Sequence, residues 1–263
     1  MYTYAWYHWL TFFYLYCFFG WIFESAYVSL LQRRPVNRGF LKLPMLPLYG
    51  SGAVMMLWVS LPVQDNLILV FLSGVVAATI LEYVTGYVME LLFKVRYWDY
   101  SDKRFNLHGY ICLSSSIAWG FLTIFMTHVI HRPIERMVLG LSSMTESAFL
   151  VITTVLFVYD VIHSTREALD LAQALKTITR LRAELDEMQV QLALLKAETA
   201  QNVQALKEAR ITAINERLSE TRAQLSRHLS ARRPAILRRN PSASSTRFAG
   251  ALKELRAAIE AHK

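Results

Sequence analysis

Residues 81–101 read LEYVTGYVMELLFKVRYWDYS and place two glutamates, Glu82 and Glu90, inside an apolar segment. Burying an ionised carboxylate in hydrocarbon costs several kcal/mol, so such residues usually face a protein interior or a water-filled cavity. Glu82, Gly86 and Glu90 recur every four residues and therefore lie along one stripe of a helix. The stretch predicts a membrane-spanning helix with a functional polar stripe. In a soluble amphipathic helix both glutamates would be ordinary surface charges.

The composition is that of a membrane protein. Of the 263 residues, 54% are apolar and only 18% are charged. Residues 1–163 hold 10 Lys/Arg and 9 Asp/Glu, whereas residues 164–263 hold 18 and 11, so nearly all of the net charge of +8 lies in the second part. No Gly or Pro occurs between Leu141 and Arg233. Two parts of different physical character therefore meet near His163.

The sequence predicts an all-α, polytopic membrane protein with about five transmembrane helices and a long cytoplasmic helix like that of a coiled coil. About 20 apolar residues cross a hydrocarbon core of roughly 30 Å. The second apolar segment is short and ends at Pro62, so it crosses at a tilt or is re-entrant. We expect a transmembrane domain over residues 1–163, a long helix over 164–230 and a basic, partly disordered tail with a short terminal helix over 231–263. The predicted spans are residues 7–31, 48–61, 67–93, 110–130 and 138–162.

Loop charges predict the orientation in the membrane. Basic residues follow the first, third and fifth spans, whereas the start of the chain and the turn over residues 63–66 carry none. The positive-inside rule then places the N-terminus outside and the C-terminus in the cytoplasm. No Lys or Arg precedes the first apolar run, which continues too far for a signal peptide, so we expect a retained first span.

The second part of the chain carries heptad spacing. Leu181, Leu185, Met188, Leu192 and Leu195 are spaced four, three, four and three residues apart. Such a helix is too long to be stable without packing, so it pairs either with a second copy of the chain or with itself as a hairpin. We expect a homo-oligomer through this C-terminal helix.

The basic segment that follows suggests a partner of another kind. It contains Arg232, Arg233, Arg238 and Arg239 with nearby Pro and Ser, a composition that favours disorder. Anionic membrane lipids are its expected partner. No recognition motif supports binding of nucleic acid.

Several polar residues are candidates for a binding path through the membrane. Arg38 presents a planar fork for a carboxylate or phosphate, but the loop around it is equally well explained as a basic anchor and a turn. Each glutamate could likewise be satisfied by a neighbouring Arg or Tyr and merely orient the helices. The candidates for the polar path or for substrate binding are Glu24, Asn37, Arg38, Glu82, Tyr83, Glu90, Asp99 and Asn106. Structural roles are expected for Gly39, Tyr49, Gly50, Gly86, Trp98 and Gly109.

No enzyme or metal motif is visible. The loop RYWDYSDKRFNLHGY at residues 96–110 matches no established metal-ligand spacing. A Walker loop, a Ser-His-Asp arrangement and a dinucleotide-binding motif are also missing from the sequence. We therefore expect neither a metal nor a cofactor, no catalytic residue can be assigned, and ATP hydrolysis within this chain is not expected.

Six short motifs, in order, resemble one bacterial family. They are GWIFE, NRGFL, PLYGSG, LEYVTGYVME, WDYS and NLHGYI. Over about residues 12–164 the chain resembles the type IV ABC-transporter, or CmpB-like, permeases. The resemblance implies a multi-pass protein of the bacterial cytoplasmic membrane and assigns no substrate and no catalytic residue. The chain departs from the family at Leu43, where members usually have Gly before the proline.

The sequence is compatible with three functions. The leading hypothesis is a permease-like component in which Glu24, Glu82 and Glu90 line a polar path, with a separate ATPase subunit docked on the cytoplasmic loops. The first alternative is an intramembrane enzyme acting on a lipid or isoprenoid, with Glu82 or Asp99 as general acid/base. The second is a membrane-anchored scaffold in which the coiled tail is the working part.

Overall fold

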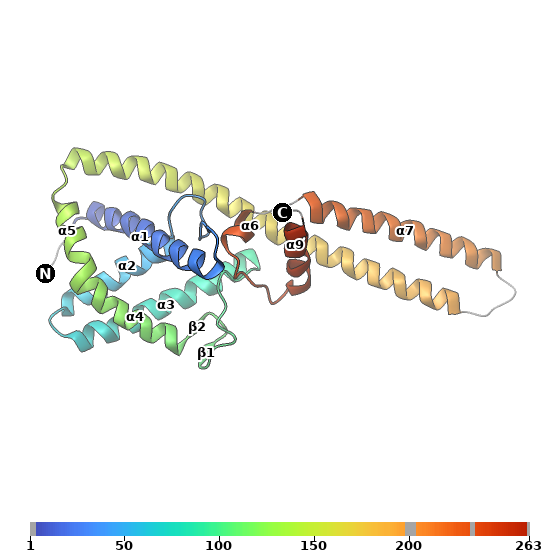
Figure 1. Ribbon diagram of the computed structural model, residues 1–263, viewed down its shortest axis with the longest axis horizontal. Coiled ribbons are helices and arrows are strands. Elements are labelled where there is room, and N and C mark those ends of the chain that lie inside the picture. The colour runs from blue at the N-terminus through green and yellow to red at the C-terminus, as the bar shows by residue number, and fades with distance from the viewer. Residues whose placement is uncertain (1–3, 198–203, 232–234, 262–263) are drawn as a thin grey trace. The chain divides into compact units, whose positions relative to one another are not determined.

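The computed structural model describes residues 4–197, 204–231 and 235–261 and is almost entirely helical (Figure 1). A two-stranded antiparallel ladder pairs Asn106 with Cys112 and Leu107 with Ile111. In chain order the elements are α1 (Trp6–Gln32), α2 (Pro47–Ser60), the 3-10 turn η1 (Leu61–Val63), α3 (Leu67–Phe93), β1 (Asn106–Leu107), β2 (Ile111–Cys112), α4 (Leu113–Phe125), the π-helical η2 (Met126–Ile130), α5 (His131–Leu139), α6 (Ser143–Ala197), α7 (Gln204–Ala231), α8 (Ala235–Arg239) and α9 (Ala249–Ala261).

Within the described residues, four helices are long and apolar enough to cross a membrane: α1, α3, the run from α4 through α5, and α6. The prediction of a multi-pass, all-α membrane protein is therefore confirmed. The second expected span, residues 48–61, corresponds to α2 with η1, a shorter apolar helix over Pro47–Val63. The fourth predicted span was drawn too short, because η2 joins α4 to α5 without a break over Leu113–Leu139. The fifth predicted span, residues 138–162, corresponds to the first part of the 55-residue α6, which begins at Ser143.

The chain forms two compact units. One consists of Met1–Ala168 with Ala235–Ser244, and the other of Leu169–Pro234 with Ser245–Lys263. The helices α1 to α5, the beginning of α6 and the short α8 belong to the first unit. That unit contains all of the residues predicted for the polar path or for substrate binding.

The loop after α1 turns back along the helix that it leaves. Val36 N donates to Ser29 Oγ, Arg38 N donates to Ser25 Oγ, and Leu46 N donates to the carbonyl oxygen of Cys17. Successive loop residues thus bond to positions progressively closer to the middle of α1. The next helix, α2, consequently begins beside the middle of α1 rather than at its end. This explains why α2 is too short to count as a full span.

The loop after α3 follows a similar course. Tyr110 Oη donates to Glu90 near the end of α3, and Tyr100 Oη donates to Glu82, two turns further back. Ser115 in the first turn of α4 also donates to Glu82. The helix α4 therefore begins beside the interior of α3. Irregular backbone at such a depth is tolerated only where protein or a wet cavity satisfies its polar groups.

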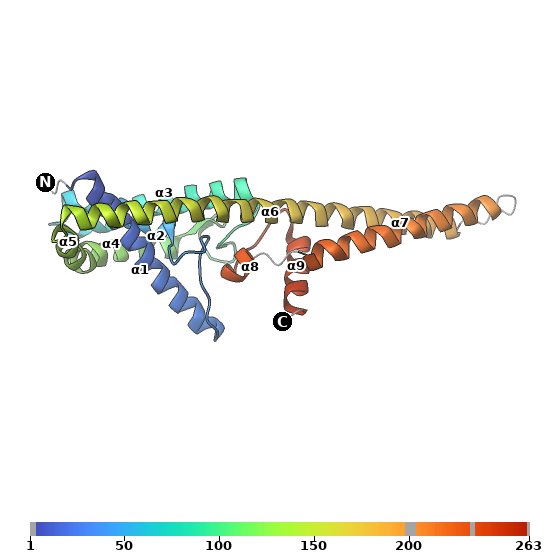
Figure 2. The ribbon, with the colours of Figure 1, turned by 90° about the horizontal axis from the view of Figure 1, so that it is seen from above.

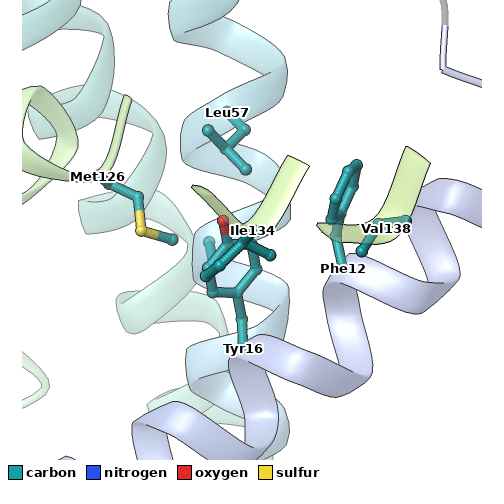
Figure 3. Close-up of a cluster of buried hydrophobic side chains, with 7 residues drawn as sticks. Phe12, Tyr16, Leu57, Met126, Ile134 and Val138 are labelled. Carbon is teal, nitrogen blue, oxygen red and sulfur yellow. The ribbon is translucent and has the colours of Figure 1, made fainter. Parts of the chain in front are cut away.

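We call the end of the first unit where α1 and α3 terminate the basic end, because Arg33 and Lys94 follow those helices there. Both residues have left-handed backbone, with φ of 50° and 58°, and close the helices as C-caps. The opposite end contains a cluster of buried apolar side chains from α1, α2, η2 and α5 (Figure 3). Its buried members are Phe12, Tyr16, Ala53, Leu57, Met126, Ile134 and Val138.

Glycines allow the helices of the first unit to approach closely. A Cβ on Gly74 of α3 would lie 2.1 Å from Thr123 Oγ1 of α4, and a Cβ on Gly50 of α2 would lie 2.6 Å from the carbonyl oxygen of Phe13. Helices in lipid gain no hydrophobic stabilisation from packing together, so small residues that allow close van der Waals contact favour their association. Close backbone approach therefore holds α2 and α4 against α1 and α3.

The second unit contains a helical hairpin. In both views α7 runs back alongside the later part of α6 (Figures 1 and 2), and Leu185 of α6 lines a groove with Leu225 of α7. The seam residues Leu181, Leu185, Leu218 and Leu225 are buried, and Arg182 forms an ion pair with Glu254 of α9 at 2.8 Å. The seam is thus covered by the chain itself. The arginines Arg232 and Arg233 lie outside the described residues.

The two glycines of the PLYGSG motif provide a stability test of the α1–α2 contact. We expect Gly50→Ala to lower the free energy of unfolding by about 1–3 kcal/mol, because the new methyl meets backbone that must move. Gly52→Ala is the matched control, since its nearest neighbours are 3.9 Å away. That change is expected to be neutral or to stabilise by up to about 1 kcal/mol through helix propensity. Equal effects of the two substitutions on thermal unfolding in detergent would contradict the packing described.

Candidate functional site

A cavity of about 520 Å³ lies in the first unit, between the two re-entrant loops. Its walls are α1, the loop over residues 33–46, the start of α2, the later part of α3, the loop over 94–112, α4 and α6. Polar groups enter from several elements, and apolar side chains fill the rest of the wall. Ligand cavities of this size, mostly apolar with a few convergent polar groups, are typical binding sites. The polar side chains that line it are Glu24, Arg38, Tyr49, Glu82, Thr85, Tyr97, Trp98, Tyr100, Trp119 and Asn240.

Glu24 of α1 is held by the loop that follows its helix and by α2. Arg38 Nε lies 3.2 Å from Glu24 Oε1, and Tyr49 Oη donates to Glu24 Oε2 at 2.7 Å. Tyr49 can sit there because Gly20, one turn before Glu24, leaves room for its ring: a Cβ on Gly20 would lie 2.4 Å from Tyr49 Cβ. One Gly, one Glu, one Arg and one Tyr thus form a compact group.

Glu82 of α3 is only 4% exposed and is surrounded by donors. Trp119 Nε1 donates at 2.9 Å, Tyr100 Oη at 3.1 Å and Ser115 Oγ at 3.4 Å. No Lys, Arg or His nitrogen among the described residues lies within 4 Å of its carboxylate. Glu82 is therefore a buried acceptor in the cavity wall, bound by neutral donors rather than by a cation.

Glu90, two turns further along α3, repeats the arrangement at Glu24. Arg96 Nε lies 2.5 Å from Glu90 Oε2, and Tyr110 Oη donates to the same oxygen at 2.6 Å. A Cβ on Gly86, one turn before Glu90, would lie 3.1 Å from the Tyr110 ring. The members correspond one to one with Gly20, Glu24, Arg38 and Tyr49, and each Arg and Tyr comes from the loop or helix that follows the glutamate.

The two halves of the site therefore share one construction. In each, a 27-residue helix ends on a basic residue with positive φ, the chain turns back, and a Tyr before or at the start of the next helix bonds to the Glu of a Gly-x-x-x-Glu motif. We call these the Glu24 group and the Glu90 group. They differ in one respect: only the Glu24 group lines the cavity.

The loop over residues 94–112 presents neutral donors to the cavity. Burial raises the pKa of Tyr100, and the charge of Glu82 raises it further. Burial also raises the pKa of Tyr97, the hydroxyl of which is buried and makes no hydrogen bond within the described residues. Both tyrosines consequently keep their protons at neutral pH. The unpartnered Tyr97 hydroxyl is a group with which a bound molecule could form a hydrogen bond.

Asp99 is not among the residues that line the cavity. Its carboxylate accepts from Ser101 Oγ at 2.5 Å and from Ser244 Oγ at 2.8 Å, and it lies 3.7 Å from Arg96 Nη1. Burial opposes ionisation, but these hydrogen bonds and Arg96 outweigh it and lower the pKa of Asp99. Asp99 is therefore an ionised structural acceptor. Within the described residues no cluster of three or more His, Cys, Asp or Glu could hold a metal ion.

The predicted residues divide between the cavity and the two loops. Glu24, Arg38, Gly39, Tyr49, Glu82 and Trp98 line the cavity, and Gly50 and Gly86 pack beside it. Asn37 accepts from Trp21 and donates to the carbonyl of Lys42, while Tyr83 meets His108. Asn106 donates to Ser101 and Lys103 carbonyls, and Gly109 adopts a φ of 74° in the same loop. These last four residues, like Glu90 and Asp99, do not line the cavity.

Comparison with known proteins supplies the family. The model of the family described as "Putative ABC-transporter type IV" matches residues 11–165. The chain belongs to this family. No curated protein and no solved structure matches it. The matched range contains the Glu24 and Glu90 groups, both re-entrant loops and all of the cavity wall except Asn240.

Sequence reasoning missed Arg96, Tyr97, Tyr100, Tyr110, Trp119 and Asn240. The sequence contains a signal for Arg96 and Tyr110. In both Gly-x-x-x-Glu motifs, which begin at Gly20 and Gly86, an Arg and a Tyr follow the Glu. Nothing in the sequence indicates that Asn240, well over 100 residues beyond the loops, reaches the same cavity.

The equivalence of the two groups can be tested with double-mutant cycles. We expect Glu24→Gln with Arg38→Met, and Glu90→Gln with Arg96→Met, to give similar coupling energies of about 1–3 kcal/mol, because both pairs are largely buried. The exposed pair Arg180–Glu184 serves as control and should give about 0.3–0.5 kcal/mol. Unfolding in mixed micelles provides the measurement, and a coupling in one group without the other would refute their equivalence.

Proposed function

We propose that this protein is a permease-like membrane component of a transporter, with the cavity as the place where a substrate binds during passage. The observation that carries the proposal is the cavity itself: it lies between two helices, α2 and α4, that begin beside the interiors of α1 and α3. Transporters commonly bind substrates where spanning helices are interrupted, because unwound backbone and helix ends supply polar contacts there. Membership of an ABC-transporter family agrees with this function.

In this proposal the basic end faces the cytoplasm of a bacterial cell. Arg33, Arg34, Arg38, Lys94 and Arg96 gather there, as the positive-inside rule requires. The N-terminus is then outside and α2 crosses only the outer part of the membrane. The cavity opens toward the inner leaflet and the cytoplasm. A separate ATPase subunit would dock on the loops of this end, because this chain has no nucleotide-binding motif.

The wall favours an amphiphilic substrate with an apolar body and a cationic head. Two carboxylates, Glu24 and Glu82, face one guanidinium, that of Arg38, so the wall has an excess of negative charge. Glu82 has only neutral donors, and a buried ion without a counter-ion is stabilised by an incoming opposite charge. The aromatic faces of Trp119, Tyr49 and Phe157 also suit a cation with apolar substituents.

An enzyme is a weaker proposal for the same site. Asp99, one of the two candidates for a general acid/base, is bonded within its own loop and to Ser244 and does not line the cavity. The described cavity wall also offers no Ser, Thr or Cys beside a base that could activate it as a nucleophile: its single hydroxyl residue of this kind is Thr85. Binding and passage of a substrate need only a cavity lined by a few polar groups and many apolar side chains, such as the one described.

Assembly through the C-terminal helix remains a proposal. The first unit contains few spans for a transporter, so a pathway between two copies is an economical solution. The seam leucines of α6 and α7 are covered within one chain, so a second copy would pack on the outside of the hairpin or exchange hairpins. Anionic lipids are the proposed partners of the basic segment near the C-terminus, in which Arg238 is exposed whereas Arg239 is buried and paired with Glu167.

Binding of matched amphiphiles to the protein in lipid nanodiscs tests the substrate class. The probes share a dodecyl tail and carry a cationic, an anionic or a neutral head: dodecyltrimethylammonium, dodecyl sulfate and dodecyl maltoside. We expect the cation to bind at least tenfold more tightly than the other two, and Glu82→Gln to remove most of this preference. Glu146→Gln is the control, since Glu146 is equally buried but bonded to Thr11 near the opposite end. Equal binding of the three probes would refute the cationic substrate.

Transport requires its own measurement. Proteoliposomes with the protein, alone and with a candidate ATPase, are loaded with the fluorescent lipophilic cation ethidium, and its movement is followed. We expect protein-dependent flux that falls at least tenfold in Glu82→Gln and persists in Glu146→Gln. If the cation binds selectively but no flux is seen, the binding site is supported and the transport function is refuted.

A further inference from the structure

A segment near the C-terminus belongs to the first unit although its chain neighbours belong to the second. Ala235–Ser244 packs with Met1–Ala168, whereas α7 before it and Ser245 after it are assigned to the second unit. We call this segment the cap. It consists of α8, labelled in Figure 2, and the following residues Asn240–Ser244. Ile236 and Leu237 are buried, as are Asn240 and Ala243.

The start of the cap is anchored to α6 and to the first re-entrant loop. Arg239 Nη2 lies 3.2 Å from Glu167 Oε2 and donates to the carbonyl of Phe40 at 3.3 Å. Ile236 N donates to the other oxygen of Glu167 at 2.7 Å. The adjacent Arg238 is exposed. Two neighbouring arginines of one short helix thus differ completely in their surroundings.

The rest of the cap crosses the cavity between its two loops. Asn240 lines the cavity, donates to the carbonyl of Gly39 at 3.0 Å and accepts from Arg38 Nη1 at 3.1 Å. Ser242 Oγ accepts from Arg38 Nη2 at 3.1 Å. Ser244 then pairs with Arg96 as an antiparallel bridge, with both N–H···O distances at 2.8 Å.

The cap therefore contacts the arginine of both groups. Arg38 gives its Nε to Glu24 and its two terminal nitrogens to Asn240 and Ser242. Arg96 gives its side chain to Glu90 and its backbone to Ser244. Removal of the cap would take away the partner of Arg38 Nη1, leave Arg38 Nη2 with the carbonyl of Tyr97, and expose the cavity wall at Gly39 and Tyr97. The cap, the two re-entrant loops and the cavity wall are therefore joined by one continuous set of contacts.

We propose that residues 235–244 are a removable cap that closes the basic end of the cavity, and that the second unit controls it. Two features support a movable rather than a permanent closure. Among the described residues the cap makes one ion pair, Arg239–Glu167, and its other polar contacts are hydrogen bonds, several of them to the charged groups of Arg38, Asp99 and Glu167. Both of its chain ends lead into the second unit. A change of that unit, for example on binding a partner, is transmitted to the cap through the chain on both sides. The proposed control of the cavity does not depend on transport and applies to any ligand that the cavity binds.

Thiol labelling of the full-length protein in lipid nanodiscs tests the cap. A reporter cysteine replaces Thr85 in the cavity wall, and a membrane-impermeant maleimide reaches it only from water. We expect Arg239→Ala to raise the labelling rate about tenfold, whereas Arg238→Ala, with the same change of charge one residue away, leaves it as in the parent. Asn240→Ala is the second opening variant in case Arg239→Ala is produced poorly. The buried native cysteines are corrected for with the protein that lacks the reporter.

A second reporter separates cap opening from loss of structure. Val70→Cys lies in α3, fully buried and outside the cavity wall, so its labelling should not change in either arginine variant. Hydrogen exchange at the Ser244 amide, which donates to Arg96, should accelerate in Arg239→Ala together with labelling of the Thr85 reporter. The proposal is overturned if the two arginine variants label alike, if the parent labels as fast as Arg239→Ala, or if the Val70 reporter accelerates with the Thr85 reporter.

Discussion

The structure depends on one constraint: every polar group that enters the membrane region needs a partner supplied by the chain. Hydrocarbon offers no hydrogen bonds, so irregular backbone and carboxylates survive there only against protein or a wet cavity. The first re-entrant loop meets this demand by bonding its backbone to serine hydroxyls and a carbonyl of α1. The second loop meets it with tyrosines that donate to the glutamates of α3. Each loop can therefore turn back into the bundle, and the cavity is the space between them.

The two Gly-x-x-x-Glu groups show how few residues this solution needs. The glycine admits a tyrosine ring against the helix, the tyrosine hydroxyl and an arginine satisfy the glutamate, and the next helix begins beside the interior of the first. Because the same four residue types serve in both halves, α1–α2 and α3–α4 act as two versions of one structural unit. A change that loosens one tyrosine would displace the start of a helix and, with it, a wall of the cavity.

Much of this fold was predictable from the sequence, because apolar length and charge report directly on the membrane. The 27-residue α3 was predicted to the residue, and the weakness of the 48–61 segment correctly marked α2 as unusual. The polar set was recognised from motifs, yet its division between cavity and loops was not. Exposed Asn37 and buried Glu82 look alike in a sequence, since burial depends on how the loops turn back. The contacts of Arg239 and Asn240 could not be foreseen either, because composition favoured disorder there and the partners lie about 200 residues away.

The three glutamates differ in the partners that satisfy their carboxylates. Glu24 and Glu90 each have an arginine, so their charges are balanced where they help to fix a helix start. Glu82 has three neutral donors and no basic group within reach among the described residues, although an arginine there would have made the fold easier to stabilise. A site built only for stability gains nothing from leaving this carboxylate without a counter-ion, because the cost of burying the charge stays uncompensated. In the proposed function a cationic ligand supplies the missing charge, and Glu82 is then the residue at which the occupied and the empty cavity differ most.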